Sequence, residues 1–134
     1  MELTIAEVAE RTGLTVHTLR YYERDGLLLE PVTRDASGRR RYGADDVRWI
    51  EMIACLRSTG MGISGVRRYA ELVRRGEGSE SERLALLRAH REEVLAQLAV
   101  MTQHLGSIEY KIDLYEQTLD TQGLTSSALK GVGS

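Results

Sequence analysis

Apolar residues recur every three or four positions over residues 1–26, a spacing that indicates amphipathic helices. Residues 4–7 read Thr-Ile-Ala-Glu, the form of a capping box, and Gly13 suits the turn after a first short helix. Thr15 can cap a second helix, which should end near Asp25 and Gly26. Two short helices joined by a tight glycine turn are the minimal form of a helix-turn-helix, whose second helix enters the DNA major groove.

The pattern changes after this pair of helices. Residues 27–43 place turn-forming residues between short extended segments, which predicts a small β-hairpin with a basic second strand. Helical spacing then predicts a core helix from Ala44 to Gly60 and a further helix from Val66 to Gly76. Glycines interrupt the pattern between these two helices, so we expect a hinge-like break there.

From Ser79 onward the apolar residues alternate spacings of three and four without a slip, which is the heptad pattern of a coiled coil. A helix of about 40 residues extends about 60 Å at roughly 1.5 Å per residue. No second such segment follows, so we expect the same helix of another copy as its partner, in a homodimer. Arg91 is the polar exception in the seam. The predicted dimerisation residues are Leu84, Leu87, Val94, Leu98, Met101, Leu105, Ile108, Ile112, Tyr115 and Leu119.

Charge is distributed unevenly along the chain. The formal net charge is -2, but residues 1–75 carry 13 basic and 11 acidic side chains, whereas residues 76–134 carry 5 and 9. The basic residues of the first part are concentrated in the run Arg39 to Arg41, so any electrostatic attraction for phosphates is local. Net charge alone does not indicate nucleic-acid binding.

Composition excludes several classes of protein. The chain has no apolar run near the roughly 20 residues that span a bilayer, so we expect a cytoplasmic protein without a membrane partner. One cysteine excludes an intramolecular disulfide framework and a multi-cysteine metal site within one chain. His17, His90 and His104 lie far apart in sequence, and no nucleophile motif or phosphate loop is present. We therefore predict no enzyme activity, metal or cofactor, and we expect His90 and His104 to be exposed helix residues.

A further signal lies in the order of short motifs along the first half of the chain. A helix, a turn, a helix with Leu-Arg-Tyr-Tyr-Glu, a Gly-Leu exit and a basic wing ending in Arg-Arg-Tyr occur in residues 5–9, 13–15, 18–23, 26–27, 39–42 and 46–47. This joint pattern resembles the DNA-binding half of MerR-family transcription regulators. The resemblance covers Leu3 to Val73 and continues in architecture through the heptad helix.

The pattern and the resemblance together predict a mainly α fold. We expect a winged helix-turn-helix DNA-binding domain in residues 1–75 and a dimerisation helix in residues 76–121 that forms an antiparallel coiled coil. A flexible tail should follow in residues 122–134.

Candidate DNA contacts come from side-chain chemistry and from the resemblance. Hydroxyl and imidazole groups on the second helix can donate to base edges and phosphates, and an arginine there suits a bidentate contact. The resemblance adds the tyrosine pair of that helix, of which we expect at least one to reach the DNA backbone, and a wing whose arginines and tyrosine grip phosphates. The predicted contacts are Thr15, His17, Thr18, Arg20, Tyr21, Tyr22, Arg39, Arg40, Arg41 and Tyr42.

Cys55 is the candidate for effector sensing. No cysteine follows it, and few residues remain after the heptads, so the cysteine clusters and large effector domains of other MerR-like regulators are absent from this sequence. The chain instead resembles the short aldehyde- and electrophile-responsive subgroup, in which a lone cysteine lies on the helix after the wing. A buried structural role is the alternative, because free cysteines are usually small buried hydrophobes. Reactivity requires partial exposure and nearby cations such as Arg48 or Arg57.

The resemblance implies a homodimer that binds and distorts palindromic promoter DNA, with RNA polymerase as a further partner and a role in stress response. Two alternatives remain open at this point. The effector can be an unrelated small molecule, with Cys55 purely structural, or the chain can be a coiled-coil adaptor or antirepressor that binds protein instead of DNA.

Overall fold

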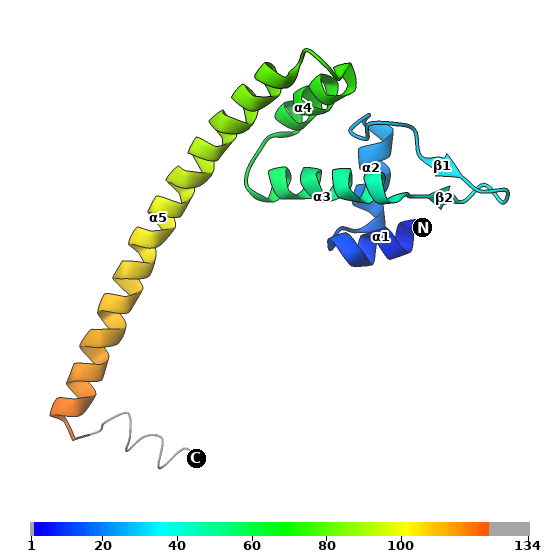
Figure 1. Ribbon diagram of the computed structural model, residues 1–134. Helices are drawn as coiled ribbons and strands as arrows, with labels where there is room; N and C mark the ends of the chain where they lie inside the picture. The colour runs from blue at the N-terminus through cyan, green and yellow to red at the C-terminus, as the bar shows by residue number, and fades with distance from the viewer. Residues whose placement is uncertain (1, 124–134) are drawn as a thin grey trace. The chain divides into compact units, whose positions relative to one another are not determined.

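The computed structural model of the chain describes residues 2–123 and is mainly helical, with one small two-stranded sheet (Figure 1). This confirms the predicted fold class of a winged helix-turn-helix followed by a long helix. The elements, in chain order, are α1 (Ile5–Thr12), α2 (Val16–Arg24), β1 (Thr33–Arg34), β2 (Arg40–Arg41), α3 (Ala44–Ser58), α4 (Ile63–Arg75) and α5 (Glu80–Thr121).

The helix-turn-helix begins and turns where the local sequence directs it. The amide of Glu7 donates to Thr4 Oγ1 at 3.2 Å and the amide of Thr4 donates to Glu7 Oε1 at 2.8 Å, which completes the predicted capping box. Gly13 ends α1 in the left-handed region, at φ 75°. Thr15 caps α2 by accepting from the amide of Thr18 at 3.0 Å. The local signals therefore account for the boundaries of α1 and the start of α2.

The wing is an antiparallel hairpin in which Thr33 pairs with Arg41 and Arg34 with Arg40. Leu3 and Tyr42 exchange both backbone hydrogen bonds, at 2.8 and 2.9 Å, so the N-terminus extends the sheet beside β2. The base of the wing is thereby attached to α1.

Two clusters of buried side chains hold the DNA-binding half together. In the first cluster, Val8 of α1, Leu19 of α2 and Ile50 of α3 pack together and fix the three helices around one core. The second cluster continues through α3 to α4 and contains Ile53 and Val66. Because α3 contributes to both clusters, both the recognition helix α2 and the helix α4 pack against it.

The break between α3 and α4 is shorter than predicted. We expected helical structure to resume at Val66, but α4 begins at Ile63 and includes Gly65. A Cβ atom at Gly65 would lie 2.9 Å from Met61 Cγ, so the missing side chain makes room for Met61. Gly65 therefore serves close packing inside a helix and not a hinge.

The chain divides into two compact units, Met1–Arg91 and a second unit that begins at Glu92. The first unit includes the beginning of α5, so it extends past the predicted domain limit at residue 75. Leu86 and Leu87 of α5 pack against the cluster of α3 and α4. Leu87 is therefore used within the protomer, which corrects its assignment to the dimer seam.

His90 also differs from expectation. It is 8% exposed, and its Nε2 lies 2.7 Å from Thr59 Oγ1 at the end of α3. The expectation of an exposed helix residue is therefore wrong, because α5 packs its first turns on α3 before it leaves the first unit.

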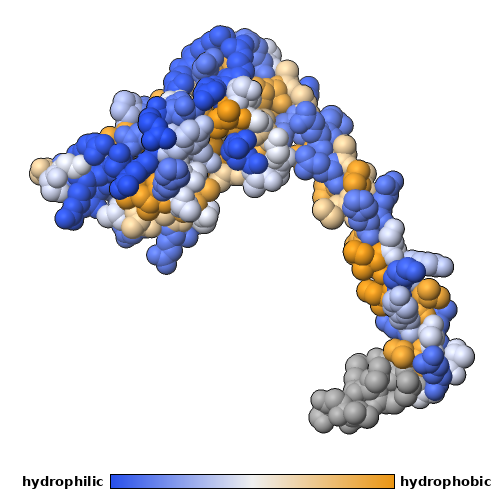
Figure 2. Space-filling view, turned by 180° about the vertical axis from the view of Figure 1, so that it is seen from behind, coloured by the Kyte–Doolittle hydropathy of each residue, from blue (hydrophilic) through white to orange (hydrophobic). Residues whose placement is uncertain are grey.

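The remaining apolar seam of α5 is exposed in the single chain. Its side chains include Met101, which is 66% exposed, and Tyr115, which is 62% exposed. Figure 2 shows apolar side chains along this helix, interleaved with polar ones. Within residues 2–123 no helix is long and apolar enough to cross a membrane. The tail predicted for residues 122–134 lies, from residue 124 on, outside the described residues.

Candidate nucleic-acid interface

The outer face of α2 carries three exposed polar side chains. His17, Arg20 and Arg24 are spaced three and four residues apart, so they lie along one stripe of the helix. Leu19 points the other way into the core. A short helix buried on one face and carrying cations on the other has the features of a recognition helix.

The hydroxyl groups of Thr15 and Thr18 are hydrogen-bonded to each other at the start of this helix. Thr15 Oγ1 accepts from the amide of Thr18 and lies 2.9 Å from Thr18 Oγ1. When the Thr15 hydroxyl donates in that contact, the hydroxyl proton of Thr18 stays available for an external acceptor. The N-cap therefore orients Thr18 while leaving it a donor.

The tyrosine pair separates into a surface residue and a core residue. Tyr21 is half-buried, and the guanidinium carbon of Arg24 lies 5.7 Å from its ring centroid. Tyr22 is 4% exposed within the cluster of α3 and α4, and burial is the main cause that raises its pKa above the usual value. Tyr22 is therefore corrected to a core residue, because it lies three positions from Leu19 on the inner face. Tyr21 is the member of the pair that can reach DNA.

The wing arginines have different partners. Arg40 Nε lies 2.5 Å from Glu23 Oε1 of α2, and Arg34 lies 3.8 Å from the same carboxylate. Arg41 Nε lies 3.1 Å from Asp35 in the hairpin turn. Arg39 is exposed and makes no ion pair with any residue in the described range 2–123. Arg39 is thus the candidate phosphate contact of the three, whereas Arg40 and Arg41 hold the wing in place.

Asp35 organises the turn of the hairpin. Its carboxylate accepts from the hydroxyl and amide of Ser37, at 2.6 and 2.9 Å, and from the amide of Arg39 at 3.0 Å. These hydrogen bonds, with that from the Ser37 hydroxyl the largest cause, hold the Asp35 pKa well below its usual value. The turn therefore presents Arg39 from a defined backbone.

Tyr42 does not occupy the position predicted for it. Its side chain is 1% exposed in the cluster of Val8 and Leu19, and its hydroxyl has no hydrogen-bond partner within residues 2–123. Burial raises its pKa, with the nearby Glu23 carboxylate as a further cause. The predicted contact of this hydroxyl with a phosphate is therefore wrong for this conformation, because the pairing of Tyr42 with Leu3 turns the ring inward.

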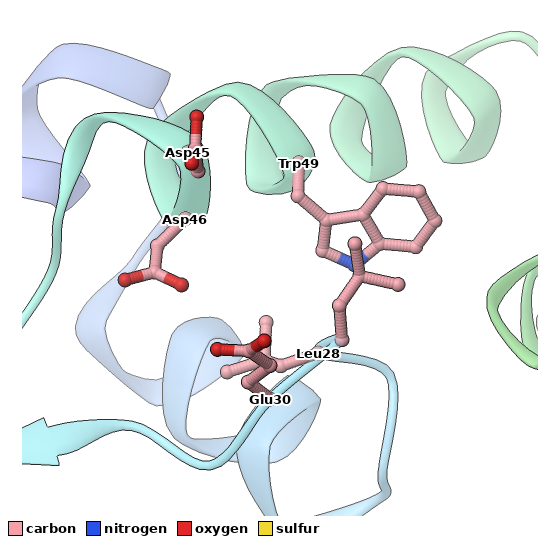
Figure 3. Close-up of a pocket in the computed structure, with 6 residues that line it drawn as sticks. Leu28, Glu30, Asp45, Asp46 and Trp49 are labelled. Carbon is pink, nitrogen blue, oxygen red and sulfur yellow. The ribbon is translucent and has the colours of Figure 1, made fainter. Parts of the chain in front are cut away.

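A pocket of about 290 Å³ lies between the segment after α2 and the start of α3 (Figure 3). Glu30, Asp45, Asp46 and Trp49 line it, and the Asp45 carboxylate is paired with Arg48. The carboxylates of Glu30 and Asp46 that remain repel phosphate. The stripe of α2 with the wing is therefore a better candidate for the DNA-facing surface than this hollow.

Sequence reasoning missed two features of the surface. Arg24 continues the stripe four residues after Arg20, a signal that helical spacing already contained. The role of Glu23 as the common partner of Arg34 and Arg40 depends on a contact over 17 residues, which no local pattern reveals.

Cys55 is a free, exposed thiol on α3. It lines an open groove of about 450 Å³ together with the turn between α1 and α2, which contributes Gly13 and Leu14. The two candidate cations are occupied, since Arg57 donates to the carbonyl of Met61 at 2.7 Å and Arg48 pairs with Asp45. Over residues 2–123 no group of three or more metal-ligating side chains is present.

A recognition helix with exposed cations beside an arginine-bearing hairpin defines a winged helix-turn-helix DNA-binding protein. Comparison with known families then gives a specific match. The family described as MerR HTH family regulatory protein matches residues 3–72, and the family described as MerR, DNA binding matches residues 47–111. The chain belongs to the MerR family and is a DNA-binding transcription regulator of the MerR type, as the motif order predicted.

Individual relatives agree with this assignment. An uncharacterized HTH-type transcriptional regulator of Haemophilus influenzae is 36% identical over 87% of this chain and 86% of its own length. The regulator AdhR of Bacillus subtilis is 41% identical over 69% of this chain and 66% of its own length. The crystal structure of HiNmlR, a MerR family regulator lacking the sensor domain and bound to promoter DNA, superposes with a TM-score of 0.82 at 34% identity and 96% coverage of both chains.

Proposed function

We propose that the protein binds a palindromic promoter site as a homodimer and distorts it, and that this distortion changes how RNA polymerase meets the promoter. The observation that carries the proposal is the exposed apolar seam of α5. Side chains such as Leu98, Leu105 and Ile108 are each more than half exposed in the single chain. An apolar stripe of that length is unfavourable in water, so we expect a second copy to cover it.

The free part of the seam runs from Val94 to Leu119, since Leu87 is used within the protomer. In a parallel pair, the two Arg91 side chains at the seam would face each other. An antiparallel pair instead places the two Arg91 side chains at opposite ends of the seam, where their like charges lie far apart. This separation supports the antiparallel orientation.

The length of the seam also supports an antiparallel pair. At 1.5 Å per residue, Val94 to Leu119 covers about 38 Å, which is close to one turn of B-DNA, the separation of half-sites for dimeric helix-turn-helix proteins. An antiparallel pair of this length carries one DNA-binding unit at each end, and a palindrome is the matching DNA symmetry.

The dimer is tested by placing a charge in the seam. Leu105→Lys brings two ammonium groups together near the centre of the antiparallel pair, so we expect the mass in solution to fall from twice the 15.0 kDa chain mass to the monomer mass. Leu95→Lys is the matched control, because Leu95 is similarly exposed but lies off the seam. Sedimentation equilibrium measures both variants, and a dimeric Leu105→Lys protein contradicts the proposed interface.

DNA binding is separated from protein binding by a salt titration. Phosphate contacts release counterions, so the affinity for a selected promoter duplex should fall steeply as salt rises. An affinity below detection at low salt favours the adaptor or antirepressor alternative.

We further propose that Cys55 responds to aldehydes, other electrophiles or oxidants. The thiol is exposed, and its groove is lined by the turn of the helix-turn-helix, so an adduct there would touch Gly13 and Leu14. The test compares promoter output with and without an aldehyde in the wild type and in Cys55→Ser. We expect the response to disappear in the variant while DNA affinity stays unchanged. An equal response in both proteins would mean that Cys55 has a structural role and that the protein responds to another effector through another site.

A further inference from the structure

A hydrogen bond joins His90 to Thr59. Thr59 Oγ1 lies 2.7 Å from His90 Nε2 and also lies 2.8 Å from the Cys55 carbonyl oxygen and 3.2 Å from the Leu56 carbonyl oxygen. When His90 carries its proton on Nε2, the imidazole donates to Thr59 and the Thr59 hydroxyl donates to a carbonyl of α3.

This contact joins the end of α3 to α5. Thr59 is the C-cap of α3, and its amide also donates to the Cys55 carbonyl, at 3.1 Å. One turn earlier on α5, Leu86 and Leu87 pack on the cluster that contains Ile53 of α3. Apolar packing is non-directional, whereas a hydrogen bond requires a narrow range of distance and angle. The hydrogen bond is thus a directional contact that restricts rotation and sliding of α5 on α3, in addition to the ion pairs that Glu82 of α5 makes with Arg68 and Arg75 of α4.

We propose that His90 is a positioning residue that sets the separation of the two recognition helices in the dimer. The inference rests on the proposed homodimer. The recognition helix α2 is packed on α3 through Leu19 and Ile50, and α3 is attached to the dimer helix through Thr59 and His90. Any rotation at this junction moves α2 relative to its symmetry mate. A buried histidine with a merely structural role would affect stability and not the spacing of half-sites.

The experiment uses full-length protein and a palindromic duplex that the wild type selects from random-sequence DNA. Affinity is measured for that duplex, for duplexes with one or two base pairs added or removed between the half-sites, and for a single half-site. We expect the wild type to prefer its own spacing by about tenfold or more, since a mismatched geometry has to be compensated by deforming DNA.

His90→Leu and Thr59→Val remove the hydrogen bond and retain the size of the side chain. Both should bind the single half-site as the wild type does and lose most of the spacing preference. His90→Gln and Thr59→Ser retain a donor and a hydroxyl, so they should restore the preference. Thr118→Val is the matched control, because the Thr118 hydroxyl only donates to Leu114 of its own helix.

The outcomes separate the two proposals. If the wild type selects no palindrome or sediments as a monomer, the proposed homodimer fails. If the palindrome is selected and both His90→Leu and Thr59→Val keep the wild-type spacing preference, the positioning role is overturned. If His90→Leu loses its helical circular dichroism signal, it is unfolded and cannot be used. The spacing preference of Thr59→Val, compared with those of His90→Gln and Thr59→Ser, then tests the positioning role.

Discussion

At the scale of single residues, the interface is shaped by side chains that are buried or paired before DNA arrives. Glu23 holds Arg40 from one strand and Arg34 from the other, so one carboxylate of α2 determines where the wing lies. Tyr42 is enclosed without a hydrogen-bond partner in the described part of the chain. Each observation leads to a prediction that differs from the simple assignment of these residues to DNA contact.

Glu23→Gln should release Arg40 to phosphate. Each phosphate contact contributes about 0.9 to the slope of log affinity against log salt, so the slope should steepen by about that amount per protomer. Glu10→Gln is the control, because it removes one exposed carboxylate of α1 that makes no ion pair within residues 2–123. A slope equal to that of the control would show that Arg40 stays on the wing.

Tyr42→Phe should stabilise the protein and leave DNA affinity unchanged. A buried hydroxyl without a partner loses its hydration, and its removal should raise the free energy of unfolding by about 1 kcal/mol. Urea denaturation measures the change. Tyr21→Phe provides the comparison, since Tyr21 is only half-buried and lies beside Arg24 on α2. Weaker DNA binding by Tyr42→Phe would instead support the original prediction that the Tyr42 hydroxyl contacts a phosphate.

At the scale of elements, two glycines inside helices serve opposite purposes. Gly65 of α4 lies against Met61, whereas a Cβ at Gly106 of α5 meets nothing within 4 Å. Alanine is better than glycine in a helix by about 1 kcal/mol when space permits.

Gly106→Ala should therefore raise the melting temperature of the α5 helix, and Gly65→Ala should lower that of the first unit, because Met61 has to move away. Thermal melts followed by circular dichroism compare the two variants directly. Equal stabilisation by both substitutions would mean that Met61 rearranges at no cost and that Gly65 has no packing role.

At the scale of the whole molecule, the two units depend on different sources of stability. The first unit has its own buried clusters. In α5, whose residues 80–121 are all described, His90 is the only buried residue, and it belongs to the first unit. A long isolated helix with an exposed apolar seam gains most of its stability from a partner. The second unit should therefore depend on association and the first should not.

The single tryptophan allows a test of this difference. Trp49 lies in the first unit, so its fluorescence reports unfolding there, whereas circular dichroism also reports α5. Raising the protein concentration a hundredfold should raise the melting temperature seen by circular dichroism. The melting temperature of the first unit, seen by Trp49 fluorescence, should stay nearly unchanged. Concentration-independent melts by both probes would contradict a dimer held by α5.

Local order in the chain was sufficient to predict most of the fold. The capping box at Thr4, the turn at Gly13 and the cap at Thr15 involve residues within four positions of each other, so their outcome depends little on the rest of the chain. The heptad spacing and the order of motifs similarly predicted a long helix and the MerR family.

The assignments of Tyr42, Leu87 and His90 failed because they depend on long-range packing. Tyr42 turns inward because it pairs with Leu3, and Leu87 and His90 are buried because α5 begins on α3. A tyrosine in a wing or a leucine in a heptad has the same local pattern whether it faces solvent, a partner or its own core. The sequence by itself thus determined the elements and the class of regulator. Which face of each element is left free for DNA or a second copy followed only from the tertiary contacts, since burial is a property of residues that are distant in the chain.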